Sequence, residues 1–271
     1  MPIKTLRQFV SDMVRYRELL IGLTAKEFKI RYRNAILGFL WTVLNPLLLM
    51  LVLSMVFRLF GAKSPYLEKY PYSAFVLCAL IPWSFMAQSL SRSTNSLLDN
   101  ASLIEKVYFP REIIALSTIL SNFLNFMVSL VVLFFFLLAF RLMPSVWIVA
   151  VPLIIVGELL FVVGISLAAS SLNVFYRDVA HIVEAVLLVW WWGTPIFYPQ
   201  QLVQEHAPPW IYRLYMANPM AAVVVSLRQI FLERRFPDVW LVATLFAIGL
   251  ASILIGITIF RRNQATIADF V

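Results

Sequence analysis

The sequence predicts an all-α integral membrane protein, and its composition and long uncharged stretches carry that prediction. Apolar residues make up 62% of the 271 residues and charged residues only 13%, whereas soluble domains are about 45–50% apolar. Several uncharged stretches reach the roughly 20 helical residues that cross a bilayer. These properties exclude a water-soluble globule. A disulfide scaffold is also excluded, because the sequence contains a single cysteine, Cys78.

Six transmembrane helices are expected from these stretches, because backbone exposed to lipid must close its own hydrogen bonds. They form a predicted transmembrane domain, residues 37–260, between an N-terminal segment, 1–36, and a short tail, 261–271. An even number of crossings puts both termini on the same side of the membrane. The predicted spans cover residues 37–57, 70–91, 113–140, 146–172, 182–193 and 239–260.

The distribution of basic residues predicts the orientation. Of the 22 lysines and arginines, 14 fall on the side of the N-terminus and 8 on the opposite side. Eight of the 14 lie in the first 36 residues, and the loop 92–112, the turn at Arg177 and the tail supply the others. Since short segments rich in Lys and Arg stay in the cytoplasm, both termini are expected there.

Residues 9–33 are expected to form an amphipathic helix in the membrane interface, because apolar residues recur there at helical spacing. The helix ends in the basic run KEFKIRYRN, residues 26–34. Its cations either anchor the helix on anionic lipid and set the topology, or they also hold the phosphate of a lipid-linked substrate. The apolar stripe comprises Phe9, Met13, Tyr16, Leu20, Leu23 and Phe28, and the cations are Lys26, Lys29, Arg31 and Arg33.

The loop 92–112 is long for a connection between neighbouring helices, and its leucines and aromatic residues recur at helical spacing. We expect a short amphipathic helix that is capped by Asp99 and Asn100 and stopped by Pro110. This helix either lies on lipid or inserts into a groove on a soluble subunit. The second loop on this side is much shorter and carries one charge of each sign: Arg177 and Asp178.

The segment 196–235 is predicted to hold re-entrant helices between the fifth and sixth spans. Five prolines between residues 195 and 219 rule out one long helix, yet residues 214–227 are apolar and too short to cross the bilayer. A pair of half-helices that dip into the outer leaflet satisfies both observations. Irregular backbone at that depth requires protein or a wet cavity around it, so a water-accessible path is expected nearby.

Aromatic side chains make up 15% of the chain, and Trp190, Trp191 and Trp192 are the densest cluster. Consecutive helical residues point about 100° apart, so at least one of these tryptophans is expected to point inward. The aromatic residues either form belts at the membrane surfaces or line a lumen in which sugar rings stack on them. An ion pore is disfavoured, because the spans offer few of the charge or carbonyl rings it requires.

Glu158 lies in the middle of a predicted span, where an ionised side chain costs roughly 2.5–3.5 kcal/mol. It is expected to face the protein interior or to be protonated. It either makes a structural hydrogen bond to a neighbouring helix or belongs to a conduction path. Small residues that are expected to let helices pack closely are Gly157, Gly164, Ala168, Gly249, Ser252 and Gly256.

The motif in residues 19–57 consists of a basic interfacial helix, then Leu-Gly-Phe-Leu-Trp, then Asn45-Pro46 inside the first span. Further motifs are LIEKVYFPREI (103–113), NVFYRDV (173–179), TPIFYP (194–199) and ANPM (217–220). Together they resemble the membrane subunits of type-2 ABC exporters, in the branch that exports polysaccharides, most closely the O-antigen permeases. The resemblance extends over nearly the whole chain.

This resemblance implies a permease that forms a homodimer with two copies of a separate ABC ATPase in the bacterial inner membrane. A polyprenyl pyrophosphate-linked polysaccharide would move outward between the two permease subunits, with membrane lipids around them and no nucleic acid involved. The chain lacks the G-x-x-x-x-G-K-[ST] motif, so ATP and Mg²⁺ are expected on the ATPase. No metal, other cofactor or catalytic group is expected on this chain.

Two sets of residues are expected to serve this function. The aromatic residues that we expect to line the substrate channel are Trp41, Trp83, Trp190, Trp191, Trp192 and Tyr198. By resemblance, the residues that couple the chain to the ATPase are Asp99, Glu105, Lys106, Tyr108, Arg177 and Asp178.

Other functions remain open. Within the ABC exporters, the nearest alternatives are permeases for teichoic acid or capsular polysaccharide, and a small-drug exporter is further removed. A proton-coupled secondary transporter would use Glu158 as its proton site. An integral membrane enzyme would need clustered histidines and aspartates at one membrane face, whereas His181 and His206 are predicted on opposite sides.

Overall fold

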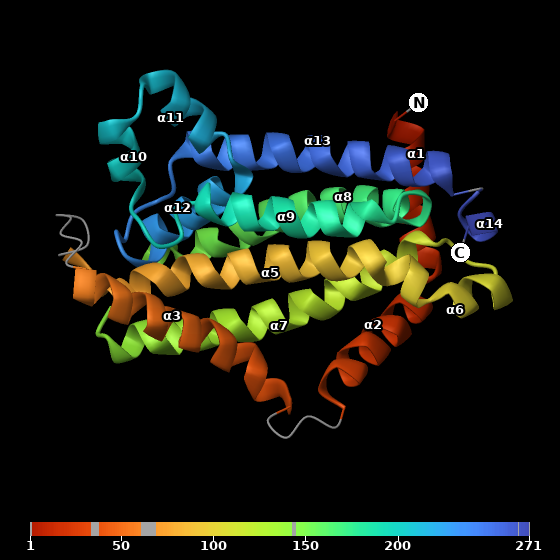
Figure 1. The fold of residues 1–271 in the computed structure, drawn as a ribbon, viewed down its shortest axis with the longest axis horizontal. Helices are drawn as coiled ribbons and strands as arrows, with labels where there is room; N and C mark the ends of the chain where they lie inside the picture. The colour runs from red at the N-terminus through yellow and green to blue at the C-terminus, as the bar shows by residue number, and fades with distance from the viewer. Residues whose placement is uncertain (1, 34–37, 61–68, 143–144, 265, 271) are drawn as a thin grey trace.

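The computed structural model describes the chain except residues 1, 34–37, 61–68, 143–144, 265 and 271, and its described part consists of helices and connecting turns (Figure 1). The helices are α1 (Pro2–Arg15), α2 (Arg17–Tyr32), η1 (Gly38–Leu40), α3 (Trp41–Phe60), α5 (Tyr72–Asp99), α6 (Ala101–Lys106), α7 (Glu112–Ala139), η2 (Val146–Ala150), α8 (Val151–Phe175), α9 (Asp178–Trp192), α10 (Gln200–His206), α11 (Pro209–Met216), α12 (Pro219–Phe231), α13 (Val239–Asn263) and α14 (Ile267–Phe270). The predicted all-α class is therefore confirmed.

Four helical segments among the described residues are long and apolar enough to cross a membrane: α5, α7, η2 with α8, and α13. They coincide with four of the six predicted spans. The first predicted span corresponds to α3, whose apolar part is Trp41–Phe57, and the fifth to α9, which has 15 residues. The apolar part of α3 and the whole of α9 are shorter than the roughly 20 residues of a full crossing, so length and composition identify four spans.

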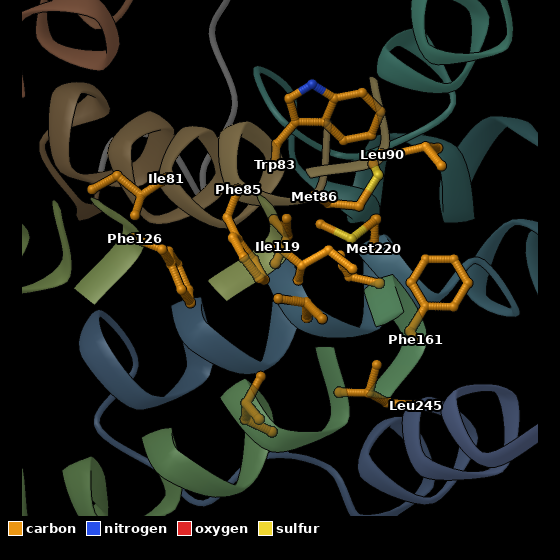
Figure 2. Packing of buried hydrophobic residues seen from close by; sticks show 14 of the residues in the cluster. Ile81, Trp83, Phe85, Met86, Leu90, Ile119, Phe126, Phe161, Met220 and Leu245 are labelled. Carbon is orange, nitrogen blue, oxygen red and sulfur yellow. The ribbon is translucent and has the colours of Figure 1, made fainter. Parts of the chain in front are cut away.

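Helix α5 is the centre of the bundle. The most apolar window of α5 is 78% buried, whereas that of α13 is 22% buried. Helices α3, α7, α8, α9 and α12 all pack against α5. Its core face carries Phe85, which stacks on Phe126 of α7 with ring centroids 4.8 Å apart (Figure 2). The helix therefore buries a face of each of its neighbours.

Helices α8 and α13 form the most extensive helix pair and lie side by side along the bundle (Figure 1). Glycines bring their backbones together: a Cβ added to Gly256 would overlap the backbone of Gly164, and one added to Gly164 would overlap Ser252. The Ser252 hydroxyl donates to the Phe161 carbonyl over 2.9 Å. This close packing confirms the predicted role of the small residues in these two spans.

The predicted amphipathic helix 9–33 is two helices, which is a correction. Helix α1 ends at Arg15, and Tyr16 adopts φ −102° and ψ 23° before α2 begins. In Figure 1, α1 crosses the end of the bundle and α2 leaves it at a different angle. The apolar stripe is real but faces protein: Phe9 is buried, and Met13, Leu20 and neighbouring stripe residues pack against the core.

The two ends of the bundle differ. Both chain termini, α1, α6 and α14 lie at one end, which we call the termini end (Figure 1). Helices α10 and α11 project at the opposite end, which we call the far end, and most of their residues are exposed. In contrast, all 13 residues of α12 are buried. The predicted segment 196–235 therefore contains two projecting helices and one buried short helix.

Candidate functional site

Tryptophans from two helices meet near the far end of the bundle. Trp83 of α5 is 5% exposed, and its ring makes edge contacts with Trp190 and Trp191 of α9 at centroid distances of 6.2 and 5.6 Å. In Figure 2, Trp83 points away from α5 on the side opposite to Phe85. Trp192, in contrast, is 63% exposed. The prediction that at least one residue of the triplet points inward is therefore confirmed.

Asn218, the residue that precedes α12, connects this tryptophan cluster to the start of α12. Its Oδ1 accepts hydrogen bonds from Trp190 Nε1 and from the backbone N–H of Met220, each over 2.9 Å. Its Nδ2 donates to the Gly193 carbonyl and to Thr194 Oγ1, each over 3.1 Å. All four hydrogen-bonding positions of the amide are thus used, and the contact also caps α12.

Arg228 of α12 is the charged residue at the centre of this region and is 3% exposed. Its Nε donates to the Phe75 carbonyl over 3.1 Å, and its Nη2 donates to the Ile196 carbonyl over 2.7 Å. The guanidinium also lies over the ring of Phe75, 3.4 Å from its centroid. Arg228 therefore fixes the 194–199 turn and the start of α5 relative to α12.

Tyr198 extends this cluster toward the surface. Its hydroxyl donates to the Trp192 carbonyl over 2.8 Å and accepts a hydrogen bond from the Tyr215 hydroxyl over 3.2 Å. Burial raises the pKa of Tyr198 above its ordinary value, so the phenol is neutral at physiological pH. Tyr198 thus combines a partly exposed ring with a hydroxyl that is already hydrogen-bonded.

A polar cavity of about 260 Å³ lies between α2, α3, α5 and α7. Arg31 Nη2 donates to Asn122 Oδ1 over 2.5 Å, and the Tyr32 hydroxyl donates to Asn125 Oδ1 over 2.8 Å. Burial lowers the pKa of Arg31, and the positive charge of Arg92 lowers it further. The other residues that line the cavity include Trp41, Thr42, Asn45, Ser84, Gln88 and Ser129.

The predicted basic patch is divided by the structure. Arg31 lines the polar cavity, whereas Lys26, Lys29 and Arg33 line an open groove along α2. Lys26 Nζ donates to Asn100 Oδ1 over 3.0 Å. Among the predicted channel residues, Trp41 shares the cavity with Arg31 and is therefore separate from the tryptophan cluster on α5 and α9.

The predicted coupling residues are exposed at the termini end. Asp99, Glu105 and Lys106 are exposed around α6, and Tyr108 in the following turn is 97% exposed. Glu105, Lys106 and Tyr108 also line a groove that α1 and the end of α13 complete. Tyr108 and its neighbour Val107, which is 50% exposed, therefore present adjoining apolar side-chain surface at this end of the bundle.

The second short loop lies beside the first because Asn173 ties it to α5. Asn173 Nδ2 donates to the Thr94 carbonyl over 3.1 Å, and its Oδ1 accepts from the Ala180 N–H over 3.1 Å. Arg177 and Asp178 are exposed in this loop. The structure therefore brings both predicted coupling segments to the same end of the bundle.

The predicted cap of α6 is wrong, and for Glu158 one of the two alternatives, a hydrogen bond to a neighbouring helix, is not observed among the described residues. Helix α6 begins after Asn100 without a side-chain cap, since Asn100 Oδ1 instead accepts a hydrogen bond from Lys26 Nζ, and it ends at Lys106, before Pro110. Glu158 is fully buried, as expected, but neither carboxylate oxygen has a hydrogen-bond partner among the described residues. The predicted hydrogen bond from Glu158 to a neighbouring helix is therefore not formed in the described part of the chain.

Sequence reasoning missed the polar residues that organise both sites. Asn218 and Arg228 were obscured by apolar neighbours, and Asn122 and Asn125 lie in one of the long apolar predicted spans. The available signal was that amides and cations inside apolar helices seldom face lipid.

Comparison with known proteins identifies the family. The ABC-2 type transporter family matches residues 18–232. The O-antigen export system permease protein RfbA of Myxococcus xanthus is 30% identical over 262 residues, which cover 97% of this chain and 98% of that protein. An O-antigen export system permease protein RfbA of Klebsiella pneumoniae is 31% identical over 254 residues, which cover 93% of this chain and 94% of that protein. The chain therefore belongs to the ABC-2 type transporter family of membrane proteins.

Proposed function

We propose that this chain is the permease subunit of an ATP-driven exporter that moves a polyprenyl pyrophosphate-linked, O-antigen-like polysaccharide outward across the bacterial inner membrane. The observation that carries the proposal is the similarity, over nearly the full length, to relatives named O-antigen export permeases. The long apolar helices support a role within the membrane. The chain is a transport subunit and not an enzyme.

Energy for transport comes from a separate ABC ATPase, of which two copies bind one permease dimer and hold ATP and Mg²⁺. The exposed surface at the termini end supports this part of the proposal, because Tyr108 and the loop with Arg177 lie there together. ATP binding favours one of two conformations by making different contacts with this surface in each. The termini end is therefore cytoplasmic.

The polysaccharide passes between two copies of the chain. Helices α3 and α9, the two shorter of six proposed crossings, flank α5 and expose apolar side chains along much of their length. Trp192, Tyr198 and Trp41 have ring surface available for weak stacking against sugars. Trp83, Trp190 and Trp191 support them from within the subunit, where Trp83 is nearly covered.

Deletion of the gene in a bacterium that carries it tests the function. The expected result is loss of polysaccharide from the cell surface, with lipid-linked polysaccharide accumulating on the cytoplasmic side of the inner membrane. Re-expression of the chain should restore export. Unchanged surface polysaccharide would contradict the proposal, and accumulation of a phosphodiester-linked polymer would assign the chain to teichoic acid export.

Coupling to the ATPase is tested in the purified complex. Tyr108→Ala should lower substrate-stimulated ATP hydrolysis several-fold, because it removes a fully exposed ring from the proposed contact surface. The matched control is Val149→Ala, which removes exposed apolar surface from η2 at the far end and should leave hydrolysis unchanged. Equal rates in wild type and Tyr108→Ala would remove the docking assignment.

A further inference from the structure

The cavity between α2, α3, α5 and α7 contains hydrogen-bond donors that lack acceptors. The Nε and Nη1 atoms of Arg31 and the Nδ2 atom of Asn122 are buried without a partner among the described residues. A buried polar group without a hydrogen bond costs free energy. These donors therefore require acceptor atoms that the described part of the chain does not supply.

The charge of the cavity selects an anion. Arg31 and Arg92 both line it, and none of its described lining residues is acidic. The charge of Arg92 opposes that of Arg31, which is part of the reason that the pKa of Arg31 is lowered. An anion bound between the two guanidinium groups would offset this repulsion, and its oxygen atoms would accept hydrogen bonds from the N–H groups of Arg31 that are unpaired in the described part of the chain.

The depth of the cavity makes the unpaired charge costly. Asn122 follows Glu112, the first residue of α7, by ten residues, which is about 15 Å of helix. The cavity therefore lies away from the termini end, and two of its lining residues, Trp41 and Arg92, are exposed. A cation at such a depth is favourable only with a partner.

The size and lining of the cavity favour a small phosphorylated head group. Its volume of about 260 Å³ is below the roughly 300–1,000 Å³ of pockets that enclose drug-sized ligands, so it does not hold an oligosaccharide. The guanidinium fork matches the oxygens of a phosphate. Beside it, the amides of Asn45 and Gln88 and the ring of Trp41 provide the hydrogen bonds and the flat apolar face that a sugar ring uses.

We propose that this cavity binds the phosphate group of the lipid-linked glycan together with the first sugar attached to it. Arg31 and Arg92 hold the phosphate oxygens, Asn122 donates a further hydrogen bond, and the lining amides and Trp41 contact the sugar. The exposed cations Lys26, Lys29 and Arg33 attract the substrate to α2 but do not form this site. The proposal rests on the proposed function, since it assigns a place to that exporter's substrate.

The test is equilibrium binding to the purified full-length chain in phosphatidylcholine nanodiscs. The probe is a radiolabelled short-chain polyprenyl pyrophosphate, with inorganic pyrophosphate, glucose 1-phosphate and phosphatidylglycerol as competitors. Arg31→Gln and Arg92→Gln should each weaken binding of the probe at least tenfold. Lys29→Gln, which removes an equal charge from the exposed groove on α2, should weaken it less than twofold. Arg92 is exposed, so Arg92→Gln should fold even if Arg31→Gln does not.

The competitors separate the sources of the phosphate. Glucose 1-phosphate should compete better than inorganic pyrophosphate, and phosphatidylglycerol should compete weakly. Strong competition by phosphatidylglycerol would assign the cavity to a membrane phospholipid and overturn the proposal, as would equal losses in Lys29→Gln and Arg92→Gln or no binding to wild type. If Arg92→Gln binds the probe normally, the cavity is not the binding site. If cells that carry this variant still export polysaccharide, the proposed function is unaffected.

Discussion

Two arginines, Arg228 in α12 and Arg31 in α2, both have buried side-chain nitrogens, but the surroundings of the two differ. Arg228 donates to two backbone carbonyls and lies flat on the ring of Phe75. Arg31 donates from Nη2 to Asn122, and its Nε and Nη1 atoms are buried without a hydrogen-bond partner in the described part of the chain. Of the two, only Arg31 therefore has donor atoms, unpaired within the described residues, to which a ligand could bind.

The neighbours of each arginine follow the same division. At the start of α12, the helix that carries Arg228, the amide of Asn218 uses all four of its hydrogen-bonding positions. In the cavity of Arg31, Asn122 Nδ2 lacks a partner among the described residues. A satisfied polar network rigidifies a fold, whereas an unsatisfied one marks a place where binding can lower the free energy. We therefore interpret the far end as a structural joint and the cavity as a binding site.

The largest expected effect is that of Arg228→Met, which tests the structural half of the comparison. The substitution leaves the Ile196 carbonyl without its donor, which lowers the free energy of unfolding by about 1–3 kcal/mol. It also removes the contact with the Phe75 ring, which lowers it by about 0.5–2 kcal/mol more. The midpoint of thermal unfolding in detergent should fall by several degrees. An unchanged midpoint would show that Arg228 does not hold the joint.

Asn218→Ala should have a smaller but clear effect. It removes the cap of α12, at about 0.5–2 kcal/mol, and leaves Trp190 Nε1 without an acceptor. Thermal unfolding and near-ultraviolet circular dichroism of the tryptophans report both losses. Asn218→Asp keeps the accepting oxygen and should lose less stability; an equal loss would mean that the donated bonds to Gly193 and Thr194 carry the effect.

Arg31→Met is the matched substitution for Arg228→Met and should change stability by less than about 1 kcal/mol, because replacing an incompletely paired buried charge by an apolar side chain is often neutral. Addition of glucose 1-phosphate should raise the unfolding midpoint of wild type and of Arg228→Met, but not of Arg31→Met. If Arg31→Met unfolds as readily as Arg228→Met, the distinction between the two arginines fails.

The smallest expected effect concerns an exposed polar network at the far end, in which Arg235 donates to Asp238 over 2.7 Å. This hydrogen bond lowers the pKa of Asp238, so its stabilisation is present above the unfolded pKa of about 3.9 and is lost as the pH falls through the lower folded value. The difference in unfolding midpoint between wild type and Asp238→Asn should therefore shrink below about pH 4. A difference independent of pH would show that the ion pair adds no stability.

Sequence patterns predicted the features that depend on residues close together in the sequence. Hydropathy identified the four long spans, since each reflects only its own composition, and the spacing of small residues identified α8 and α13 as helices that pack closely, but not as partners of each other. The break at Tyr16 was missed because the apolar stripe continues across it. The cavity was missed because Arg31 and Asn122 are 91 residues apart, and no local pattern indicates which amide a cation will meet.

The role of each predicted site residue also depended on tertiary packing. Trp190 and Trp192 are equivalent in sequence, yet one donates to Asn218 and the other is exposed. Tyr108 and Arg177 were predicted to share a surface, and the hydrogen bonds of Asn173 bring their loops to one end of the bundle. Residue type alone did not distinguish the satisfied arginine from the unsatisfied one.

The most direct test of export uses inverted inner-membrane vesicles that contain this chain and its ATPase, loaded with lipid-linked polysaccharide on the outer face. The account predicts that ATP makes the polysaccharide resistant to an added glycosidase, and that vesicles lacking either subunit show no such protection. Protection that develops without the ATPase and is abolished by a protonophore would contradict the account and identify a proton-coupled transporter.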